Sequence, residues 1–248
     1  AAAVNRGLKL FSGEYVTWMD SDDIYYPDAI QKKVEFLKRH KEFDFVLNYG
    51  EIVNETDLNH QLGILKRTKP IGKDELFKDL LDESNVVFVP GTILVKTESL
   101  KKAIPNLDIY ESREGQNWQL MLPLAYCCRV GYLDEVLFKY VVHTDSHSHT
   151  KRTLEQEYKR RDNFYKLQCE TIDKIGTMQK NEKEYWKNYA LTRSILTKYR
   201  MAIYYHNFPE SVKKQSELKE RGVKILWKDG FLSHHFRIIT RRIKEIIG

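Results

Sequence analysis

Three carboxylates stand within four consecutive residues near the start of the chain, in the segment Asp20-Ser21-Asp22-Asp23. Carboxylates this close repel one another, and a bound cation relieves the repulsion. Hard divalent cations such as Mg²⁺ and Mn²⁺ prefer oxygen ligands and commonly bridge to phosphates. The segment therefore predicts a site where a cation holds a phosphorylated ligand. The alternative is a solvent-exposed acidic turn in front of the next helix.

Two elements predicted from the hydrophobic pattern must position this acidic segment. Residues 14–19 form a short apolar run that predicts a strand. Residues 28–40 follow Pro27 and place Ile30, Val34 and Leu37 on one face of an amphipathic helix. The carboxylates thus follow the end of a strand, where open α/β sheets bind their ligands.

The remaining elements divide the chain into two parts. Strands and helices mixed through residues 1–150 predict an α/β domain, whereas residues 151–248 read as a helical extension. The further helices are expected at 1–11, 73–81, 98–103, 115–128, 151–175, 182–206, 210–221 and 234–247. The further strands are expected at 43–49, 61–65, 86–89, 92–95, 130–133 and 136–142.

Composition excludes several classes of protein. The 248 residues are 42% hydrophobic and 31% charged, without a run of the ~20 apolar residues that a membrane helix needs and without a signal-peptide pattern. Three cysteines make neither a disulfide framework nor a zinc site, which fits a reducing cytosol. The net charge is −5 over residues 1–150 and +11 over residues 151–248. The second part is therefore expected to meet an anionic partner.

Three blocks of the sequence resemble motifs of family 2 inverting glycosyltransferases of the GT-A fold. The resemblance covers roughly residues 1–150 and rests on order and spacing. The blocks are Asn5-Arg6-Gly7-Leu8 with Ser12-Gly13-Glu14-Tyr15-Val16, Trp18–Asp23 and Pro27; Glu114-Gly115-Gln116-Asn117-Trp118; and Tyr140–Ser148. The resemblance implies a GT-A (Rossmann-like) mixed sheet, and transfer of a sugar, with inversion, from a nucleotide-sugar donor to an acceptor.

The resemblance also assigns roles to individual residues. Asp20, Ser21 and Asp22 would form the D-x-D motif, with Asp20 near the ribose and donor sugar. Asp22 would bind Mg²⁺ or Mn²⁺, and Asp20 and His143 complete the expected metal set. A strand-end histidine bonded to backbone is the alternative for His143.

The donor site would further include Asn5, Gln116 and Trp118, with Trp118 either stacking on a sugar or packing in the core. Where family members carry the acidic pair that includes the general base, this chain has Gln116 and Asn117. Neither amide takes up a proton at neutral pH. We therefore expect Glu114 as the base and Asn117 beside it in the catalytic site, and Glu111 and Asp23 are further candidates for the base. Two alternatives are that the amides position the acceptor while the base lies elsewhere, and that activity has been lost.

A second departure concerns the start of the sequence. Family members begin with a strand resembling V-S-I-I-I-P-x-Y-N and an acidic D-D-G-S segment, which hold the nucleobase, and neither occurs here. We therefore expect an N-terminally truncated GT-A sheet that binds a sugar nucleotide poorly by itself, and an inactive fragment is one alternative. A non-catalytic GT-A binding or scaffold protein is the other.

The expected partners are a UDP-sugar and a glycan or lipid-linked acceptor of bacterial cell-surface polysaccharide synthesis. Residues 231–247 mix isoleucine and phenylalanine with arginine and lysine, a pattern typical of a helix at a membrane surface. We therefore expect a cytoplasmic protein held peripherally on the inner face of the plasma membrane. Aromatic residues in the basic half fall at helical spacing, which favours core packing over nucleic-acid binding.

Overall fold

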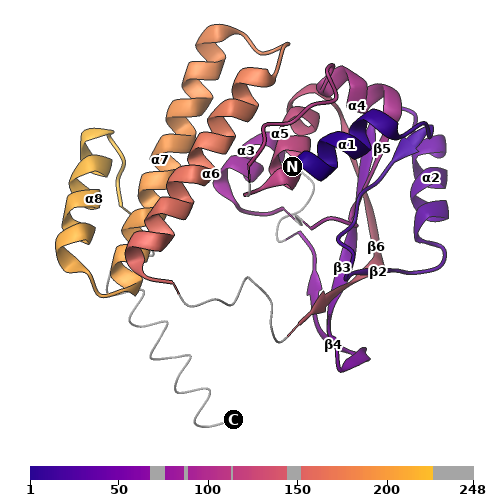
Figure 1. Cartoon of the computed structure of the whole chain (residues 1–248), viewed down its shortest axis with the longest axis horizontal. Helices are drawn as coiled ribbons and strands as arrows, with labels where there is room; N and C mark the ends of the chain where they lie inside the picture. The colour runs from indigo at the N-terminus through magenta and orange to yellow at the C-terminus, as the bar shows by residue number, and fades with distance from the viewer. Residues whose placement is uncertain (68–75, 87–88, 113, 144–151, 226–248) are drawn as a thin grey trace. The chain divides into compact units, whose positions relative to one another are not determined.

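The computed structural model describes residues 1–67, 76–86, 89–112, 114–143 and 152–225 (Figure 1). The chain divides into two compact units. The first consists of residues 1–150 with 167–183, and the second of residues 151–166 with 184–248. The end of the helix α6 (Leu154–Lys174) and the start of the helix α7 (Lys180–Tyr204) thus belong with the first unit. The functional division at residue 150 stays a prediction.

The first unit is built on a mixed six-stranded sheet in the order β1-β5-β3-β6-β2, with β4 paired to β3. The strands β3 and β6 run parallel, and the other pairs are antiparallel. The strands are β1 (Tyr15–Val16), β2 (Ile24–Tyr25), β3 (Phe45–Asn54), β4 (Asp57–Leu65), β5 (Ile93–Lys96) and β6 (Val130–Val142). The expected α/β fold is confirmed.

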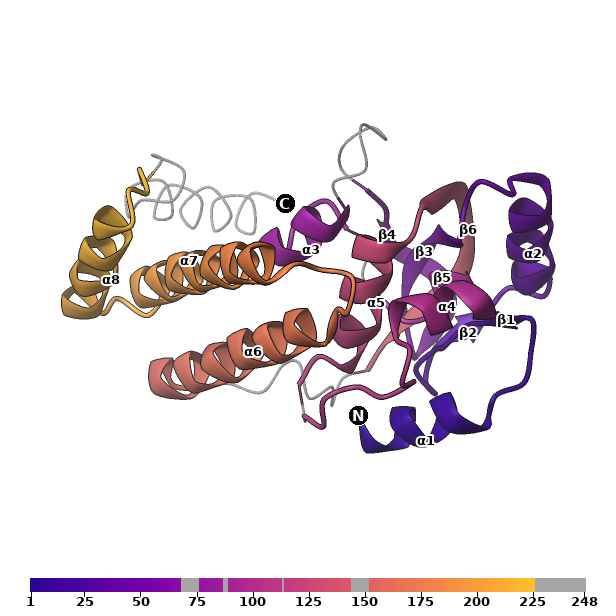
Figure 2. The same cartoon turned by 90° about the horizontal axis from the view of Figure 1, so that it is seen from above.

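Helices cover both faces of this sheet (Figures 1 and 2). On one face, Leu37 of α2 (Ala29–Arg39) packs with Val46 and Leu94 in a buried cluster. The helices α3 (Leu76–Asp82) and α5 (Gln116–Cys127) lie on the other. The remaining helices of this unit are α1 (Ala2–Leu10) and α4 (Thr97–Ala103).

The predicted elements are largely found, with corrections in the sheet. The strands predicted at 43–49 and 61–65 are longer, as β3 and β4. Val86 and Val89 of the strand predicted at 86–89 lie in no strand, and its other two residues lie outside the described ones. The run 14–19 enters the sheet only at Tyr15–Val16, because the Trp18 carbonyl accepts a hydrogen bond from the loop residue Gly91 instead. The short strand β2 was not predicted, since two residues carry no alternation. The two strands predicted at 130–142 are one strand, because Asp134-Glu135 forms a bulge between the pairs Asn48–Leu133 and Tyr49–Val136.

The predicted helix at 28–40 exists, but its buried face differs. Ile30 is 39% exposed, whereas Ala29, Lys33 and Leu37 are buried. The spacing i, i+4, i+8 is as helical as the one predicted. The sequence pattern did not indicate this buried face because one of its residues is a lysine, and lysine is almost never fully buried.

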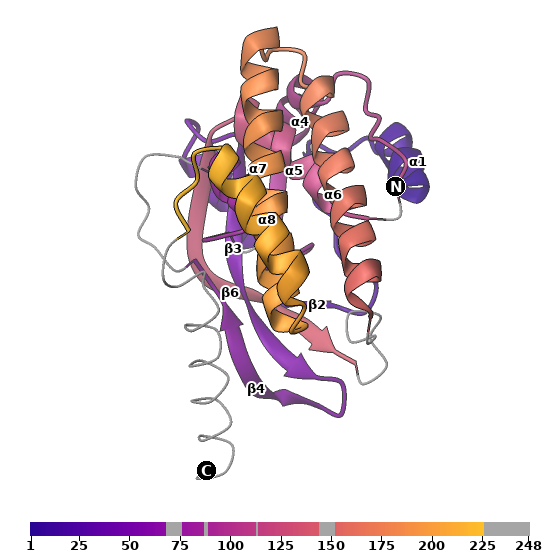
Figure 3. The same ribbon diagram turned by 90° about the vertical axis from the view of Figure 1, so that its left-hand side faces the viewer.

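The second unit is helical over its described residues. The helix α8 (Phe208–Glu220) packs Leu218 against Ile195, Leu196, Tyr199 and Ile203 of α7, as the pairing of the two helices in Figure 3 shows. In the part of the chain that the structure describes, no helix is long and apolar enough to cross a membrane. The helix predicted at 234–247 lies outside the described residues.

Candidate functional site

The acidic segment forms a tight turn between β1 and β2. The backbone N–H of Asp23 donates to the carbonyl of Asp20 at 3.2 Å, which closes the turn. Asp20, Ser21 and Asp22 are exposed, while Asp23 is buried and its Oδ1 accepts from the Val141 N–H at 3.0 Å. The turn therefore presents two carboxylates outward and anchors itself to β6 with the third.

The three carboxylates of the turn lie so close together that negative charge on all of them at once is unfavourable. Although Asp20 is exposed as a residue, partial desolvation of its carboxylate by the surrounding turn raises its pKa, and the neighbouring charge of Asp22 raises it further. Burial also raises the pKa of Asp23 to about 6, although its hydrogen bond from Val141 acts in the opposite direction. A cation at the two outward carboxylates would relieve this repulsion.

The structure brings His143 to the same turn. Its Nε2 lies 3.5 Å from Oδ2 of Asp22, and its Nδ1 lies 2.6 Å from Oε2 of Glu55, to which it donates. The hydrogen bond to Glu55 raises the pKa of His143. His143 is thus held by the Glu55 carboxylate next to Asp22, and it lies beside the acidic turn as predicted. Its role as a metal ligand stays a prediction.

Glu55 was missed by the sequence analysis. It lies in the turn between β3 and β4, 88 residues before His143, and belongs to no motif. Only the parallel pairing of β3 with β6, which sets Asn54 beside Val142, brings the two side chains together. That long-range register has no local signal in the sequence.

The residues present fit a divalent cation whose remaining ligands come from a phosphorylated substrate. Among the described residues, no group of three or more His, Cys, Asp or Glu side chains forms a complete protein cage. Mg²⁺ is, however, usually bound by one or two protein carboxylates, with phosphate oxygens of the substrate supplying further ligands. The buried Oδ2 of Asp23, which has no hydrogen-bond partner, adds an unused oxygen to the same turn.

The predicted catalytic residues lie on a different element. Gln116, Asn117 and Trp118 form the first turn of α5 and are half-buried. Gly115 precedes them in a left-handed conformation (φ 59°), and the Glu114 N–H donates to Oγ of Ser112 at 3.0 Å. Glu114 is therefore presented at the start of α5, beside the amides that replace the acidic pair.

Asn5 has a structural contact. Its Nδ2 donates to the Ile109 carbonyl at 2.9 Å, and its Oδ1 accepts from the Ile109 N–H at 2.8 Å. The side chain is 7% exposed. These bonds tie α1 to the segment that leads to α5, so the role of Asn5 in donor binding stays a prediction.

Asn5→Ala is expected to destabilise the protein by roughly 2 kcal/mol, because it leaves both backbone groups of Ile109 without their buried partner. Urea unfolding measures the effect, and Asn59→Ala on the exposed strand β4 is the control. Unchanged stability together with weakened nucleotide binding would instead assign Asn5 to the donor site.

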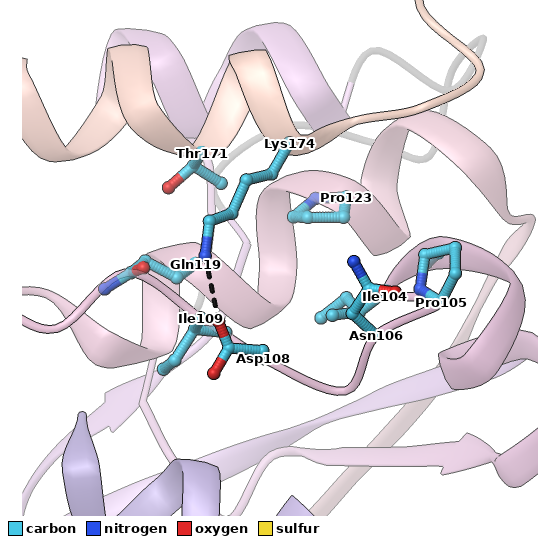
Figure 4. Close-up of a pocket in the computed structure, with 10 residues that line it drawn as sticks. Ile104, Pro105, Asn106, Asp108, Ile109, Gln119, Pro123, Thr171 and Lys174 are labelled. Carbon is cyan, nitrogen blue, oxygen red and sulfur yellow. Dashed lines mark hydrogen bonds and ion pairs between the residues drawn. The ribbon is translucent and has the colours of Figure 1, made fainter.

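The segment held by Asn5 also lines a cavity of about 150 Å³ within the first unit (Figure 4). Its walls come from residues 103–109, from Gln119 and Pro123 of α5, and from Thr171 and Lys174 of α6. An ion pair of 3.1 Å between Lys174 and Asp108 closes one side. Gln119 in the first turn of α5 lines the cavity and donates to the Tyr110 carbonyl. The cavity therefore adjoins the start of α5.

A mixed α/β sheet with an acidic turn between two short strands agrees with the GT-A fold that the resemblance implies, and comparison with known proteins supports the same resemblance. Residues 1–104 match the family model described as Glycosyl transferase family 2. This match, which covers less than half of the chain, agrees with the resemblance to family 2 glycosyltransferases.

Three curated relatives illustrate the similarity. An uncharacterized glycosyltransferase of Haemophilus influenzae is 27% identical over 180 residues, 69% of this chain and 54% of its own length. One of Rickettsia typhi is 24% identical over 160 residues, 63% of this chain and 48% of its own. A putative glycosyltransferase of Bacillus subtilis, EpsE, is 24% identical over 155 residues, 62% and 52% of the two chains. The chain spans about half the length of the curated relatives it matches.

Proposed function

We propose that the protein transfers a sugar, with inversion, from a UDP-sugar to a glycan or lipid-linked acceptor. The observation that carries the proposal is the turn between β1 and β2, where Asp20 and Asp22 are exposed and separated by one residue, in a chain whose residues 1–104 match the model of Glycosyl transferase family 2. This arrangement suits a donor whose diphosphate is held through a cation.

Asp20 and Asp22 would hold Mg²⁺ or Mn²⁺, with His143 beside Asp22. When bound, the cation supplies Lewis-acid stabilisation of the negative charge on the departing nucleoside diphosphate. The Glu55 carboxylate orients the His143 ring by accepting from Nδ1, so that Nε2 faces Asp22. Ser21 lies exposed between the two carboxylates, where it meets the same ligand.

Glu114 takes the proton from the acceptor hydroxyl in this proposal. Single in-line displacement needs a base at the acceptor, and Gln116 and Asn117 cannot serve. Glu114 adjoins them at the start of α5, where Asn117 and Gln116 orient the acceptor and donor by hydrogen bonds and Trp118 offers an aromatic face. The adjoining cavity beside Asp108 and Lys174 would contact more distant parts of the acceptor.

Glu114→Gln is expected to lower kcat by about 10²–10⁴-fold with little change in donor KM, because it removes proton transfer and keeps the shape of the side chain. Glu98→Gln, an exposed carboxylate of α4, is the control, and Glu111→Gln tests the other candidate carboxylate of this segment. An unchanged kcat in Glu114→Gln would leave Glu114 without a role as the base.

The proposed setting is the cytoplasmic face of the plasma membrane in a bacterium, with lipid-linked acceptors of cell-surface polysaccharide synthesis. The basic charge of residues 151–248 supports it, since such a surface attracts anionic lipid headgroups. Residues 231–247, which would make the membrane contact, lie outside the described residues.

A second candidate is a non-catalytic GT-A protein that binds or scaffolds. The replacement of the acidic pair by Gln116 and Asn117 favours it. Both candidates predict ligand binding, but only the first predicts turnover.

The deciding experiment measures release of UDP by the full-length protein from a panel of UDP-sugars, with Mn²⁺, Mg²⁺ or EDTA, and with lipid extracts as acceptors. We expect metal-dependent turnover with at least one donor. Binding of UDP without turnover across the panel would favour the scaffold, and turnover unaffected by EDTA would contradict the metal site.

A further inference from the structure

A fully buried lysine lies behind the acidic turn. Lys33 of α2 is 0% exposed, and its Nζ donates to the Gly91 carbonyl at 2.6 Å. The same Nζ lies 4.7 Å from the centre of the Tyr25 ring. Burial lowers the pKa of Lys33 to about 7, which shows how unfavourable the charge is there. A side chain so costly to bury needs a reason in the structure around it.

Gly91 connects Lys33 to the residues before the turn. Its N–H donates to the Trp18 carbonyl at 2.7 Å, two residues before Asp20, while its own carbonyl accepts from Lys33. Gly91 has φ +97°, which glycine tolerates, and a Cβ there would lie 3.1 Å from the Phe138 ring and 3.4 Å from Met19. The backbone that holds Trp18 is therefore fixed in position by Lys33 on one side and by close packing on the other.

Tyr25 connects Lys33 to the residues after the turn. Tyr25 lies two residues beyond Asp23, and its hydroxyl is 2.8 Å from Oγ1 of Thr17, with which it shares a hydrogen bond. Thr17 in turn donates to the Ile93 carbonyl at 2.6 Å. Both ends of the segment from Trp18 to Tyr25 are thus joined to the segment 91–93, and Lys33 contacts both connections.

We propose that Lys33 is a positioning residue that sets the separation and orientation of Asp20 and Asp22 for a cation and diphosphate. Lys33 reaches no ligand itself and acts through Gly91 and Tyr25. An apolar side chain of similar length would fill the space but leave the Gly91 carbonyl unpaired. A lysine donates to that carbonyl whether its amine is charged or neutral. The inference rests on the proposed function, because it assumes that the turn binds a metal-nucleotide complex.

The test compares Lys33→Met with Lys32→Met in the full-length protein. Lys32 is the adjacent, partly exposed residue, paired with Asp28 and Glu135. Binding of Mn²⁺ in the presence of UDP is measured by electron paramagnetic resonance at a temperature where circular dichroism shows every variant folded. We expect Lys33→Met to weaken Mn²⁺ binding by about 10–100-fold, the range found when groups that orient metal ligands are removed. Lys32→Met should stay within about threefold of the wild type.

Hydrogen exchange of the Gly91 amide supplies a readout that does not depend on a ligand. Its bond to the Trp18 carbonyl should open more often in Lys33→Met, so exchange at Gly91 should accelerate by at least about tenfold while that of Lys32→Met does not change. If Lys33→Met does not fold, Lys33→Gln, which keeps a polar end too short to reach Gly91, replaces it.

The outcomes separate the two proposals. A folded Lys33 variant that binds Mn²⁺ and UDP as the wild type does overturns the positioning role and leaves the proposed function intact. A wild-type protein that binds no Mn²⁺ with UDP overturns the proposed function and the positioning role with it. If Lys33→Met leaves the binding of Mn²⁺ and UDP unchanged and only accelerates exchange at Gly91, Lys33 is a purely structural residue.

Discussion

Asp22→Asn in the full-length protein is expected to reduce sugar transfer by roughly 10²–10³-fold without unfolding the protein. The side chain of Asp22 is 52% exposed, and its nearest charged partner is Nε2 of His143 at 3.5 Å. Loss of one negative ligand weakens the hold on the cation and on the diphosphate charge that develops in the transition state, and the removal of a single such stabilising group costs about this much. The folded state loses little, because an exposed carboxylate contributes little to stability.

The measurement is kcat/KM at several Mn²⁺ concentrations, for Asp22→Asn, Asp20→Asn and Asp28→Asn. Asp28 is an equally exposed carboxylate whose partner is Lys32, and its variant should behave as the wild type. Higher Mn²⁺ should partly restore Asp22→Asn, since the defect lies in affinity as well as in turnover. Normal turnover of Asp22→Asn at every Mn²⁺ concentration would rule out the metal role of the turn.

The part of the site that sequence predicts is the part made by neighbours in the chain. The acidic turn, the strand residue Tyr15 before it and the helix that begins at Ala29 follow from local pattern, and the structure contains all three. The start of α5 is also local, since Gly115 and the amides after it lie within one turn. Short-range rules are enough wherever the residues that cooperate are also close in sequence.

The remainder depends on pairings that no local pattern encodes. His143 meets Glu55 because β3 and β6 run parallel with a bulge at Asp134-Glu135, where the sequence predicted a break between two separate strands. The sequence gives no sign that Lys33 is buried, because lysine is almost never fully buried, yet its amine reaches a carbonyl 58 residues away in sequence. In both cases the polar partner comes from a strand or loop that is distant in sequence, so only the assembled sheet reveals it.

Lys33 also predicts an unusual dependence of stability on pH. Its pKa is about 7 in the folded protein and 10.5 in the unfolded chain, so between these values the unfolded chain binds a proton that the folded protein does not. The free energy of unfolding therefore rises with pH in this window, by at most about 1.4 kcal/mol per pH unit and by about 2 kcal/mol between pH 7 and pH 9. Above pH 9 the sign reverses for Cys128, because burial raises its pKa from 9.0 to about 12 and the unfolded chain loses that proton first. Asp23, with a pKa of about 6, changes charge below the window.

Urea unfolding from pH 7 to pH 9 in EDTA and reductant, followed by tryptophan fluorescence, measures this effect. We expect the free energy of unfolding of the wild type and of Lys32→Met to rise across the window by about 2 kcal/mol more than that of Lys33→Met, since methionine has no proton to release. His143, whose pKa is raised by its bond to Glu55, lowers stability with rising pH alike in all three. All three should then lose stability above about pH 10, where unfolded tyrosines ionise while buried ones such as Tyr25, whose pKa burial raises, stay protonated. If wild type and Lys33→Met show the same slope between pH 7 and pH 9, the amine of Lys33 is charged in the folded protein, and the hydrogen bond to Gly91 is made by an ammonium group whose burial other contacts offset.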